Sequence, residues 1–192
     1  MMQSGSGMMQ TDVSGISAHI KSSQAFLNLP MGSWAEQDGT ALAGFASGDS
    51  TTPGISAGDE SFGVRWNNHA NPDPISMSVP IPPDLDASQD VVVHMLYAQT
   101  GANDTITWTV GAFNNVVNVD YQGDADFGGA TAGNAPETNT TVEATRTLAA
   151  ANVTGSPCVL VLTLQPTAGT LGTDDAILLG VWLEYTRKTL TS

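Results

Sequence analysis

Residues 105–110 read Thr105-Ile106-Thr107-Trp108-Thr109-Val110, a strict alternation of hydroxyl-bearing and apolar side chains. Because successive side chains of a β-strand point to opposite faces, this stretch predicts a strand with one buried and one solvated face. The segment from Thr141 to Leu148 alternates in the same way. By contrast, Val91–Val93 and Val159–Leu162 are apolar at every position, which predicts central strands covered on both faces.

Outward from these segments, short β-type runs follow one another from about residue 39 to the end of the chain. We expect strands at Thr40–Ala46, Ser61–Asn67, Ile75–Ile81, Asp90–Gln99, Thr105–Ala112, Asn115–Tyr121, Thr140–Leu148, Pro157–Gln165 and Ala176–Arg187. Gly101-Ala102-Asn103-Asp104 and Asn114-Asn115 supply turn residues suited to hairpins. This spacing, with almost no helical periodicity, predicts an all-β fold: an antiparallel two-sheet β-sandwich of the jelly-roll type.

The first 38 residues differ in composition from the rest. Gly, Ser, Met and Gln dominate, and the apolar residues are scattered. We expect residues 1–38 to form an extended N-terminal arm that becomes ordered against a partner, although residues 12–26 also fit a short helix. Residues 39–192 then form the β-sandwich domain.

Charge is the most lopsided property of the chain. Five Lys and Arg residues stand against 19 Asp and Glu residues, which gives a formal net charge of −14. Such a chain repels phosphate backbones and anionic lipids, so we expect neither nucleic acid nor membrane as a partner. Cys158 is the only cysteine and lies in an apolar run, which predicts a buried small side chain and no intrachain disulfide.

Patterns typical of catalysis fit poorly. Gly54-Ile55-Ser56-Ala57-Gly58 matches the G-x-S-x-G nucleophile elbow, but that elbow requires a strand before it and a helix after it. The carboxylate pairs Asp84/Asp86 and Asp174/Asp175 are expected by chance among 19 acids. His94 interrupts an apolar strand and is expected to be hydrogen-bonded there. The sequence therefore predicts a protein that is not an enzyme and needs no cofactor.

One loop is a weak candidate for a metal site. Asp120, Asp124 and Asp126 could converge on calcium, which prefers oxygen ligands from loops. Their spacing fails the EF-hand pattern, because Ala125 and Ala135 stand where that pattern needs glycine and glutamate. The alternative is a solvated loop whose glycines make turns, and we expect no bound metal.

Interface residues are predicted from the scarcity of basic side chains. Arg65, Arg146 and Arg187 are each expected to have a carboxylate partner, within the chain or in another subunit. Trp66 and His69 flank an Asn-rich loop and are further interface candidates. Trp108 and Trp182 lie in strands that are expected to form the core.

Several segments resemble the jelly-roll cement (decoration) proteins of tailed bacteriophages. They are Phe62–Asn68, Val79–Asp86 with the following Asp90–Leu96 strand, and Asp174–Tyr185. The resemblance implies a homotrimer on the outer surface of the virion capsid. There it would bind the lattice of the major capsid protein, clamp neighbouring subunits and stabilise the phage head.

Three functional hypotheses follow. The first is the capsid cement or decoration subunit that this resemblance implies. The alternative is a receptor- or glycan-binding β-sandwich of a phage tail fibre or tailspike, which exposed aromatic platforms would favour. The third is a glycan hydrolase on a jelly-roll scaffold, for which the sequence suggests no substrate.

Overall fold

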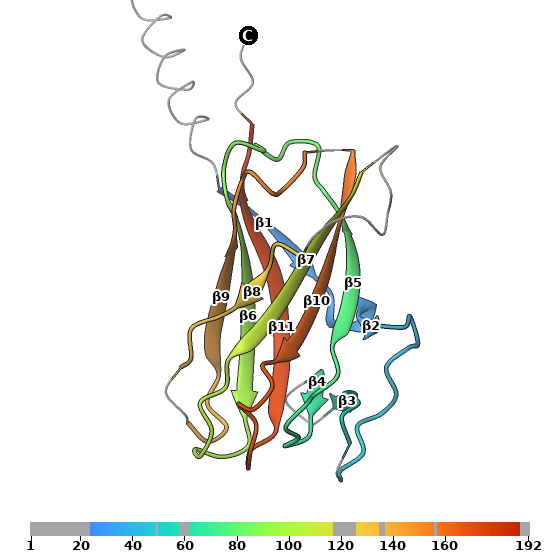
Figure 1. The fold of residues 1–192 in the computed structure, drawn as a ribbon, viewed down its shortest axis with the longest axis vertical. Helices are drawn as coiled ribbons and strands as arrows, with labels where there is room; N and C mark the ends of the chain where they lie inside the picture. Colours follow the sequence, from blue (N-terminus) through green and yellow to red (C-terminus); the bar gives the residue numbers. More distant parts are fainter. Residues whose placement is uncertain are drawn as a thin grey trace, which may run out of the picture.

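The computed structural model describes residues 24–48, 50–57, 62–116, 126–134, 137–155 and 157–188, and it shows a sandwich of two antiparallel β-sheets (Figure 1). Within these ranges a single 3₁₀ turn, η1 (Met31–Ser33), is the one helical element. The predicted all-β, jelly-roll-type sandwich is confirmed. Its strands are β1 (Gln24–Leu29), β2 (Ala35–Glu36), β3 (Gly54–Ala57), β4 (Phe62–Trp66), β5 (Ile75–Pro80), β6 (Val91–Gln99), β7 (Trp108–Val116), β8 (Gly129–Ala130), β9 (Val142–Leu148), β10 (Cys158–Pro166) and β11 (Ala176–Thr186).

The strands divide into a six-stranded and a five-stranded sheet. The first has the order β3-β4-β11-β6-β9, with β1 also paired to β11, and the second has the order β2-β5-β10-β7-β8. The two longest ladders join β11 to β6 and β10 to β7. These central strands include the Val91–Val93 and Val159–Leu162 runs, so their predicted central position is confirmed.

Alternation of side chains builds the core between the sheets. In β10 the even-numbered residues from Cys158 to Pro166 are buried and the odd-numbered ones are half-buried. An aromatic cluster joins the two layers: the Trp108 ring from β7 meets Trp66 and Tyr97 edge-on, with ring centroids 5.5 and 5.4 Å apart. Edge-to-face packing of this kind adds about 0.5–1.5 kcal/mol per pair to the gain from burial.

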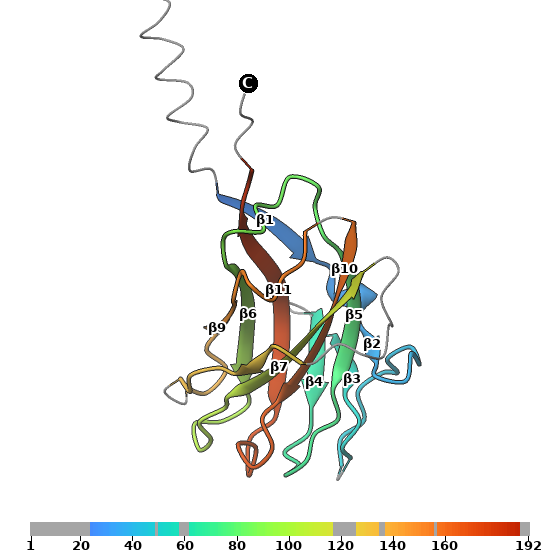
Figure 2. The ribbon, with the colours of Figure 1, turned by 45° about the horizontal axis from the view of Figure 1, so that its top comes forward.

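The predicted boundary at residue 38 is wrong. β1 pairs with β11 along its whole length, and Leu29, Met31 and Trp34 are buried in the core. Figures 1 and 2 show β1 lying across one end of the sandwich and leading to β2 beside β5. Residues 24–38 thus belong to the sandwich, because β1 and β2 pair with its two sheets and their inward apolar side chains pack in the core. Residues 1–23, the rest of the predicted arm, lie outside the described residues.

Two predicted hairpins are absent from the described structure. Residues 108–116 form one uninterrupted strand, in which Asn114 is buried and its side-chain amide donates to the Asn152 carbonyl. That internal partner lets an asparagine lie within a strand where the sequence suggests a turn. The Gly101–Asp104 segment does not join neighbouring strands either, since β6 and β7 lie in different sheets.

Two further expectations are corrected at the sheet edges and surfaces, and the rejection of the Gly54–Gly58 nucleophile elbow agrees with the structure. The outer faces of β6 and β10 are not covered by a third layer in the described structure, since Val92, Val159 and Val161 keep some exposure. Residues 40–46 make isolated bridges rather than a strand. The Gly54–Ala57 segment is the edge strand β3, which supports no nucleophile elbow because no helix follows it among the described residues. No helix of the described part is long and apolar enough to span a membrane.

Candidate binding surface

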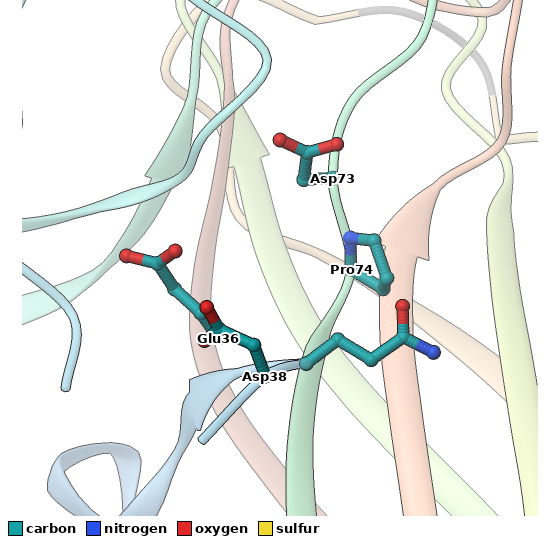
Figure 3. A pocket seen from close by; sticks show the side chains of 5 residues that line it. Glu36, Asp38, Asp73 and Pro74 are labelled. Carbon is teal, nitrogen blue, oxygen red and sulfur yellow. The ribbon is translucent and has the colours of Figure 1, made fainter. Parts of the chain in front are cut away.

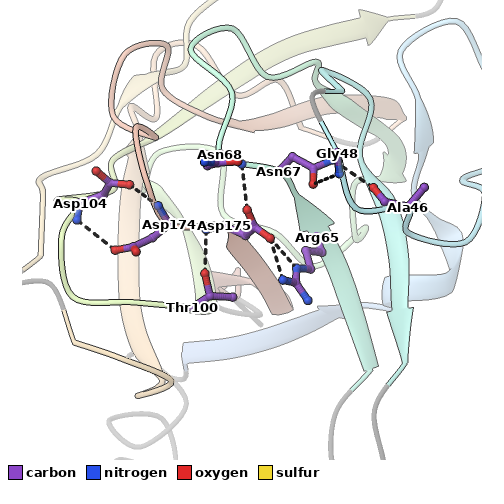
Figure 4. Close-up of polar contacts among 9 residues, drawn as sticks. All are labelled: Ala46, Gly48, Arg65, Asn67, Asn68, Thr100, Asp104, Asp174 and Asp175. Carbon is purple, nitrogen blue, oxygen red and sulfur yellow. Dashed lines mark hydrogen bonds and ion pairs between the residues drawn. The ribbon is translucent and has the colours of Figure 1, made fainter.

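Polar residues gather at the end of the sandwich where β6 ends and β11 begins (Figure 4). Asp174 is only 3% exposed, and its carboxylate accepts hydrogen bonds from the backbone N–H groups of Asn103 and Asp104 at 2.7 and 3.1 Å. The side-chain amides of Asn103 and Gln99 donate to it as well, at 3.1 and 3.4 Å. Gly101 is required beside it, because a Cβ there would lie 2.0 Å from Asp174 Oδ1.

Asp104 makes the reciprocal contact, with the loop that contains Asp174. Its Oδ2 accepts the backbone N–H groups of Gly172, Thr173 and Asp174 at 3.0, 2.8 and 2.7 Å. Burial opposes ionisation of this carboxyl, but the three backbone donors outweigh burial and lower the pKa of Asp104 below its ordinary value. Asp104 and Asp174 therefore connect the two loops through hydrogen bonds.

The neighbouring carboxylate completes this structural network. Arg65 Nε and Nη2 both donate to Asp175 Oδ2, at 3.0 and 2.7 Å, and the Asn68 N–H donates to Asp175 Oδ1 at 2.9 Å. The guanidinium also lies 4.5 Å from the centre of the Phe45 ring. The predicted carboxylate partner of Arg65 is confirmed. The pair Asp174/Asp175 thus holds the fold together, which argues against the glycosidase-like role considered for it.

The other basic candidates differ from one another. Arg187 Nε lies 3.2 Å from Asp84 Oδ2 in an exposed ion pair, so its predicted carboxylate partner is confirmed. Arg146 instead donates to the backbone carbonyls of Gly128 and Ala130, at 2.6 and 3.3 Å. That contact ties β9 of one sheet to β8 of the other, because the guanidinium reaches across the open side of the sandwich.

The structure separates the two remaining interface candidates. Trp66 is fully buried, and its indole N–H donates to the Asp73 carbonyl at 2.7 Å, so the prediction of an interface role is wrong. His69 lies in the loop after β4, where its Nδ1 accepts the Asn71 N–H at 3.0 Å. No described contact assigns His69 to an interface.

The candidate metal loop is only partly described. Asp120 and Asp124 lie outside the described residues. Asp126 Oδ1 accepts the backbone N–H groups of Ala112 and Gly128, at 2.9 and 2.8 Å, which is a turn-forming role. Among the described residues, no group of three or more His, Cys, Asp or Glu side chains is placed to hold a metal ion.

An acidic pocket of about 180 Å³ lies where β2 meets the start of β5 (Figure 3). Its lining includes three carboxylates, Glu36, Asp38 and Asp73, with Gln37 and Pro74. Thr51 Oγ1 donates to Asp73 Oδ2 at 2.6 Å, and the Thr40 N–H donates to Asp38 at 2.9 Å. Hydrogen bonds within the chain thus already hold two of the three carboxylates.

The outer side of the six-stranded sheet brings together residues from four strands. We call this surface the His94 face: the outward residues of β1, β11, β6 and β9. The register sets one row across it, Asn28, Trp182, His94 and Thr145, and a second row of Phe26, Glu184, Val92 and Thr147. Residues directly opposite one another in a sheet share a face, so these side chains are neighbours although their strands are distant in sequence.

His94 is the centre of a hydrogen-bonded and stacked cluster. Its Nδ1 lies 2.5 Å from Glu143 Oε1, and its Nε2 lies 3.0 Å from Glu184 Oε2. The Trp182 ring stacks on the imidazole with centroids 5.0 Å apart and planes inclined by 9°. The expectation of a hydrogen-bonded histidine is confirmed. The strand that contains Trp182 forms part of the core as expected, but Trp182 itself faces outward, since its neighbours Val181 and Leu183 are the buried residues.

Phe26 is the most exposed large apolar side chain of the described residues, at 64%. It lies opposite Glu184 and diagonally across from Trp182. The sequence reasoning missed Phe26 because it falls within the predicted arm. A period-two reading of Gln24–Leu29, with Ala25 and Leu29 facing inward, is the signal that would have found it. An exposed ring beside a Trp–His stack, an amide and a carboxylate can contact an apolar ring face and bind hydroxyl groups at once.

Comparisons with known proteins support the fold. No protein-family model matches the chain, and no curated protein matches it. Among solved structures, a xylan-binding module (CBM15) aligns with a TM-score of 0.54 and 12% identity over 86% of this chain and 99% of that chain. A xylanase of Cellvibrio japonicus in complex with xylopentaose aligns with a TM-score of 0.47 and 14% identity over 83% of this chain, which spans 28% of that chain. At 12% identity, the likeness to the xylan-binding module shows that the two share a β-sandwich fold.

Proposed function

We propose that this protein is a non-catalytic attachment module that binds a neutral polysaccharide through the His94 face. The observation that carries the proposal is the exposed Phe26 ring beside the stacked Trp182 and His94 rings. Aromatic rings pack against the apolar faces of sugar rings, and the adjoining Asn28 amide and Glu184 carboxylate offer hydrogen bonds to sugar hydroxyls. The His94 face is thus the surface through which the receptor- or glycan-binding alternative would work.

Charge narrows the class of polysaccharide. A formal charge of −14 repels polyanions, and Glu143 and Glu184 bring this repulsion to the His94 face itself. A polymer of uncharged sugars avoids that cost. The xylan-binding module that shares this fold suggests neutral xylo-oligosaccharides as the first probe.

Calorimetric titration of the full chain with xylohexaose, a neutral glucan and polygalacturonate tests the proposal. We expect binding to at least one neutral sugar and none to the polyanion. Phe26→Ala should weaken binding about two- to tenfold, the range of 0.5–1.5 kcal/mol for an aromatic contact. Phe62→Ala is the matched control, since Phe62 is 50% exposed on β4, outside both rows of the His94 face.

Two results would contradict the glycan proposal. One is the absence of binding to every neutral polysaccharide across a broad array, while the protein gives a cooperative thermal transition. The other is an equal loss of affinity in Phe26→Ala and Phe62→Ala, which would place the contact elsewhere on the chain.

A second candidate is the capsid decoration subunit, with the major capsid protein as its partner and the outer surface of the virion as its location. The observation that favours it is the lack of charge along the three middle strands of the five-stranded sheet, since β5, β7 and β10 contain no charged residue. Such a face suits contact with protein better than contact with sugar. Mass spectrometry of purified virions tests this candidate: a copy number near that of the major capsid protein supports it, and absence from the particle rejects it.

A further inference from the structure

The outer side of the five-stranded sheet carries a surface that the glycan proposal does not use. The central strands β5, β10 and β7 contain no Asp, Glu, Lys, Arg or His, although the chain has 19 acidic residues. We call the outward residues of these strands the neutral face. They are Ser76, Ser78, Pro80, Thr109, Gly111, Phe113, Asn115, Val159, Val161, Thr163 and Gln165.

The register places apolar side chains at the centre of the neutral face. Val161 lies between Ser78 and Phe113, and Val159 lies between Pro80 and Asn115. Both valines and Phe113 remain partly exposed in the single chain. Hydroxyl and amide side chains surround them, so the surface has an apolar middle and an uncharged polar rim, as protein interfaces do.

Side chains pack closely around Gly111 on this face. A Cβ on Gly111 would lie 2.2 Å from Thr163 Oγ1 and 3.4 Å from a ring carbon of Phe113. The glycine therefore lets the Thr163 and Phe113 side chains lie over the strand. At one edge, the Asp126 carboxylate is engaged by the Ala112 and Gly128 backbone N–H groups.

We propose that the neutral face is a self-association surface through which two copies of this chain pack face to face. Charge is the reason for choosing a second copy as the occupant. Two chains of charge −14 repel one another, and on the His94 face a contact would bury Glu143 and Glu184 against their like. At the neutral face the three strands contribute no carboxylate, and Asp126, whose Oδ2 lies beside Gly111, already accepts two backbone N–H groups through its Oδ1.

The neutral face is also self-complementary, which supports a second copy of the chain as its partner. A two-fold contact brings each patch against its own copy, so an apolar centre meets an apolar centre and a hydroxyl rim meets a hydroxyl rim. A basic partner would be drawn to the carboxylates on the other surfaces of the chain instead of to this face. A second copy shares the net charge of −14, so the pairing that brings the fewest carboxylates together is one neutral face against another.

The size of the face sets the expected strength. Two nine-residue strands and one six-residue strand, at roughly 3.3 Å per residue and 4.8 Å between strands, cover about 400 Å². That is about half of the roughly 800 Å² per partner that stable complexes bury. We therefore expect a weak dimer, with a dissociation constant on the order of 10–500 μM, which co-localisation on one polysaccharide or particle would strengthen.

Analytical ultracentrifugation of the full chain, without any glycan, tests the proposal. Over protein concentrations of about 5–500 μM, which span the expected dissociation constant, the mass should rise from monomer towards dimer. Higher salt should strengthen association by screening the net charge. Val161→Glu and, on the neighbouring strand, the exposed Ser78→Glu should each weaken it at least tenfold. Thr145→Glu adds the same charge at an exposed site on the His94 face and should change it less than twofold.

The opposite outcomes would overturn the proposal. A monomer at the highest concentration would do so, as would equal weakening by Ser78→Glu and Thr145→Glu. A trimer whose mass resists both neutral-face substitutions would reject face-to-face packing and support the virion candidate instead. Because no sugar is present, failure of the glycan proposal leaves this result unaffected.

Discussion

The two outer faces of the sandwich share one backbone pattern and differ in almost every side chain. On the His94 face an imidazole, two carboxylates and an indole contact one another across β6, β9 and β11. On the neutral face, β5, β7 and β10 present valine, serine and threonine without a single charge. The inner faces of both sheets are mostly apolar because they build one core, whereas the residues of each outer face are not restricted by that core and can make a different contact.

This comparison separates residues that hold the sheets from residues that are displayed on them. The loop-end network around Asp174 belongs to the first group, since it connects the end of β6 with the start of β11 and the segment that leads to β7. Phe26 and Val161 belong to the second group. Substitutions in the first group should lower the stability of the sandwich that carries both faces. Substitutions in the second group should change only the contacts made at one face.

Asp174→Ala should cause the largest effect, because it leaves the N–H groups of Asn103 and Asp104 without their buried acceptor. We expect the free energy of unfolding to fall by about 2–4 kcal/mol. Chemical denaturation measures it, with Asp86→Ala at an exposed turn as the control. A change below about 0.5 kcal/mol would show that water replaces these contacts and that the two sheets do not depend on this carboxylate.

Trp182→Ala should lower the free energy of unfolding by about 1–2 kcal/mol, because it removes a half-buried ring stacked on His94. Comparing it with His94→Ala and the double variant gives the coupling between the two rings. We expect a coupling of about 0.5–1.5 kcal/mol. Additive effects would mean that the His94 face displays its aromatic residues independently.

The lowered pKa of Asp104 predicts a pH dependence for the loop end. Since the folded-state pKa lies below the ordinary value, the carboxylate contributes stability above about pH 4 and loses it as the pH falls through the lowered pKa. Asp104→Asn should therefore destabilise the protein by about 1 kcal/mol at pH 7 and by much less once the pH has fallen below the lowered pKa. Thermal unfolding across this range measures the difference; a constant difference would rule out the charge as its cause.

Arg187→Ala should cause the smallest effect. Both members of the Arg187–Asp84 pair are about half exposed, and exposed ion pairs typically contribute about 0–1 kcal/mol. We expect a loss of less than about 0.5 kcal/mol that disappears in about 1 M salt. Arg65→Ala, at the less exposed pair with Asp175, should exceed it clearly; equal effects would mean that burial does not distinguish the two.

Sequence reasoning recovered the strands whose pattern is local. The alternation in Thr105–Val110 and Thr141–Leu148 and the apolar runs at Val91 and Val159 led to β7, β9, β6 and β10. It failed where a residue's partner is distant. Asn114 was expected in a turn because its buried partner, the Asn152 carbonyl, is provided by a loop far along the chain. Residues 24–38 are assigned to an arm from the sequence because the partner that makes Gln24–Leu29 a strand, β11, lies far along the chain.

The sequence by itself determined the all-β character, the inward face of the main strands and the excess of negative charge. These properties depend on residue type and on a period of two, which any stretch of chain carries on its own. Only the tertiary structure decided that Phe26 lies beside Glu184, that His94 stacks on Trp182, and that the three uncharged strands share one sheet. The physical reason is that the alternation of apolar and polar residues indicates which side of a strand faces inward. It does not state which strands become neighbours, since contacts between distant segments select the pairing.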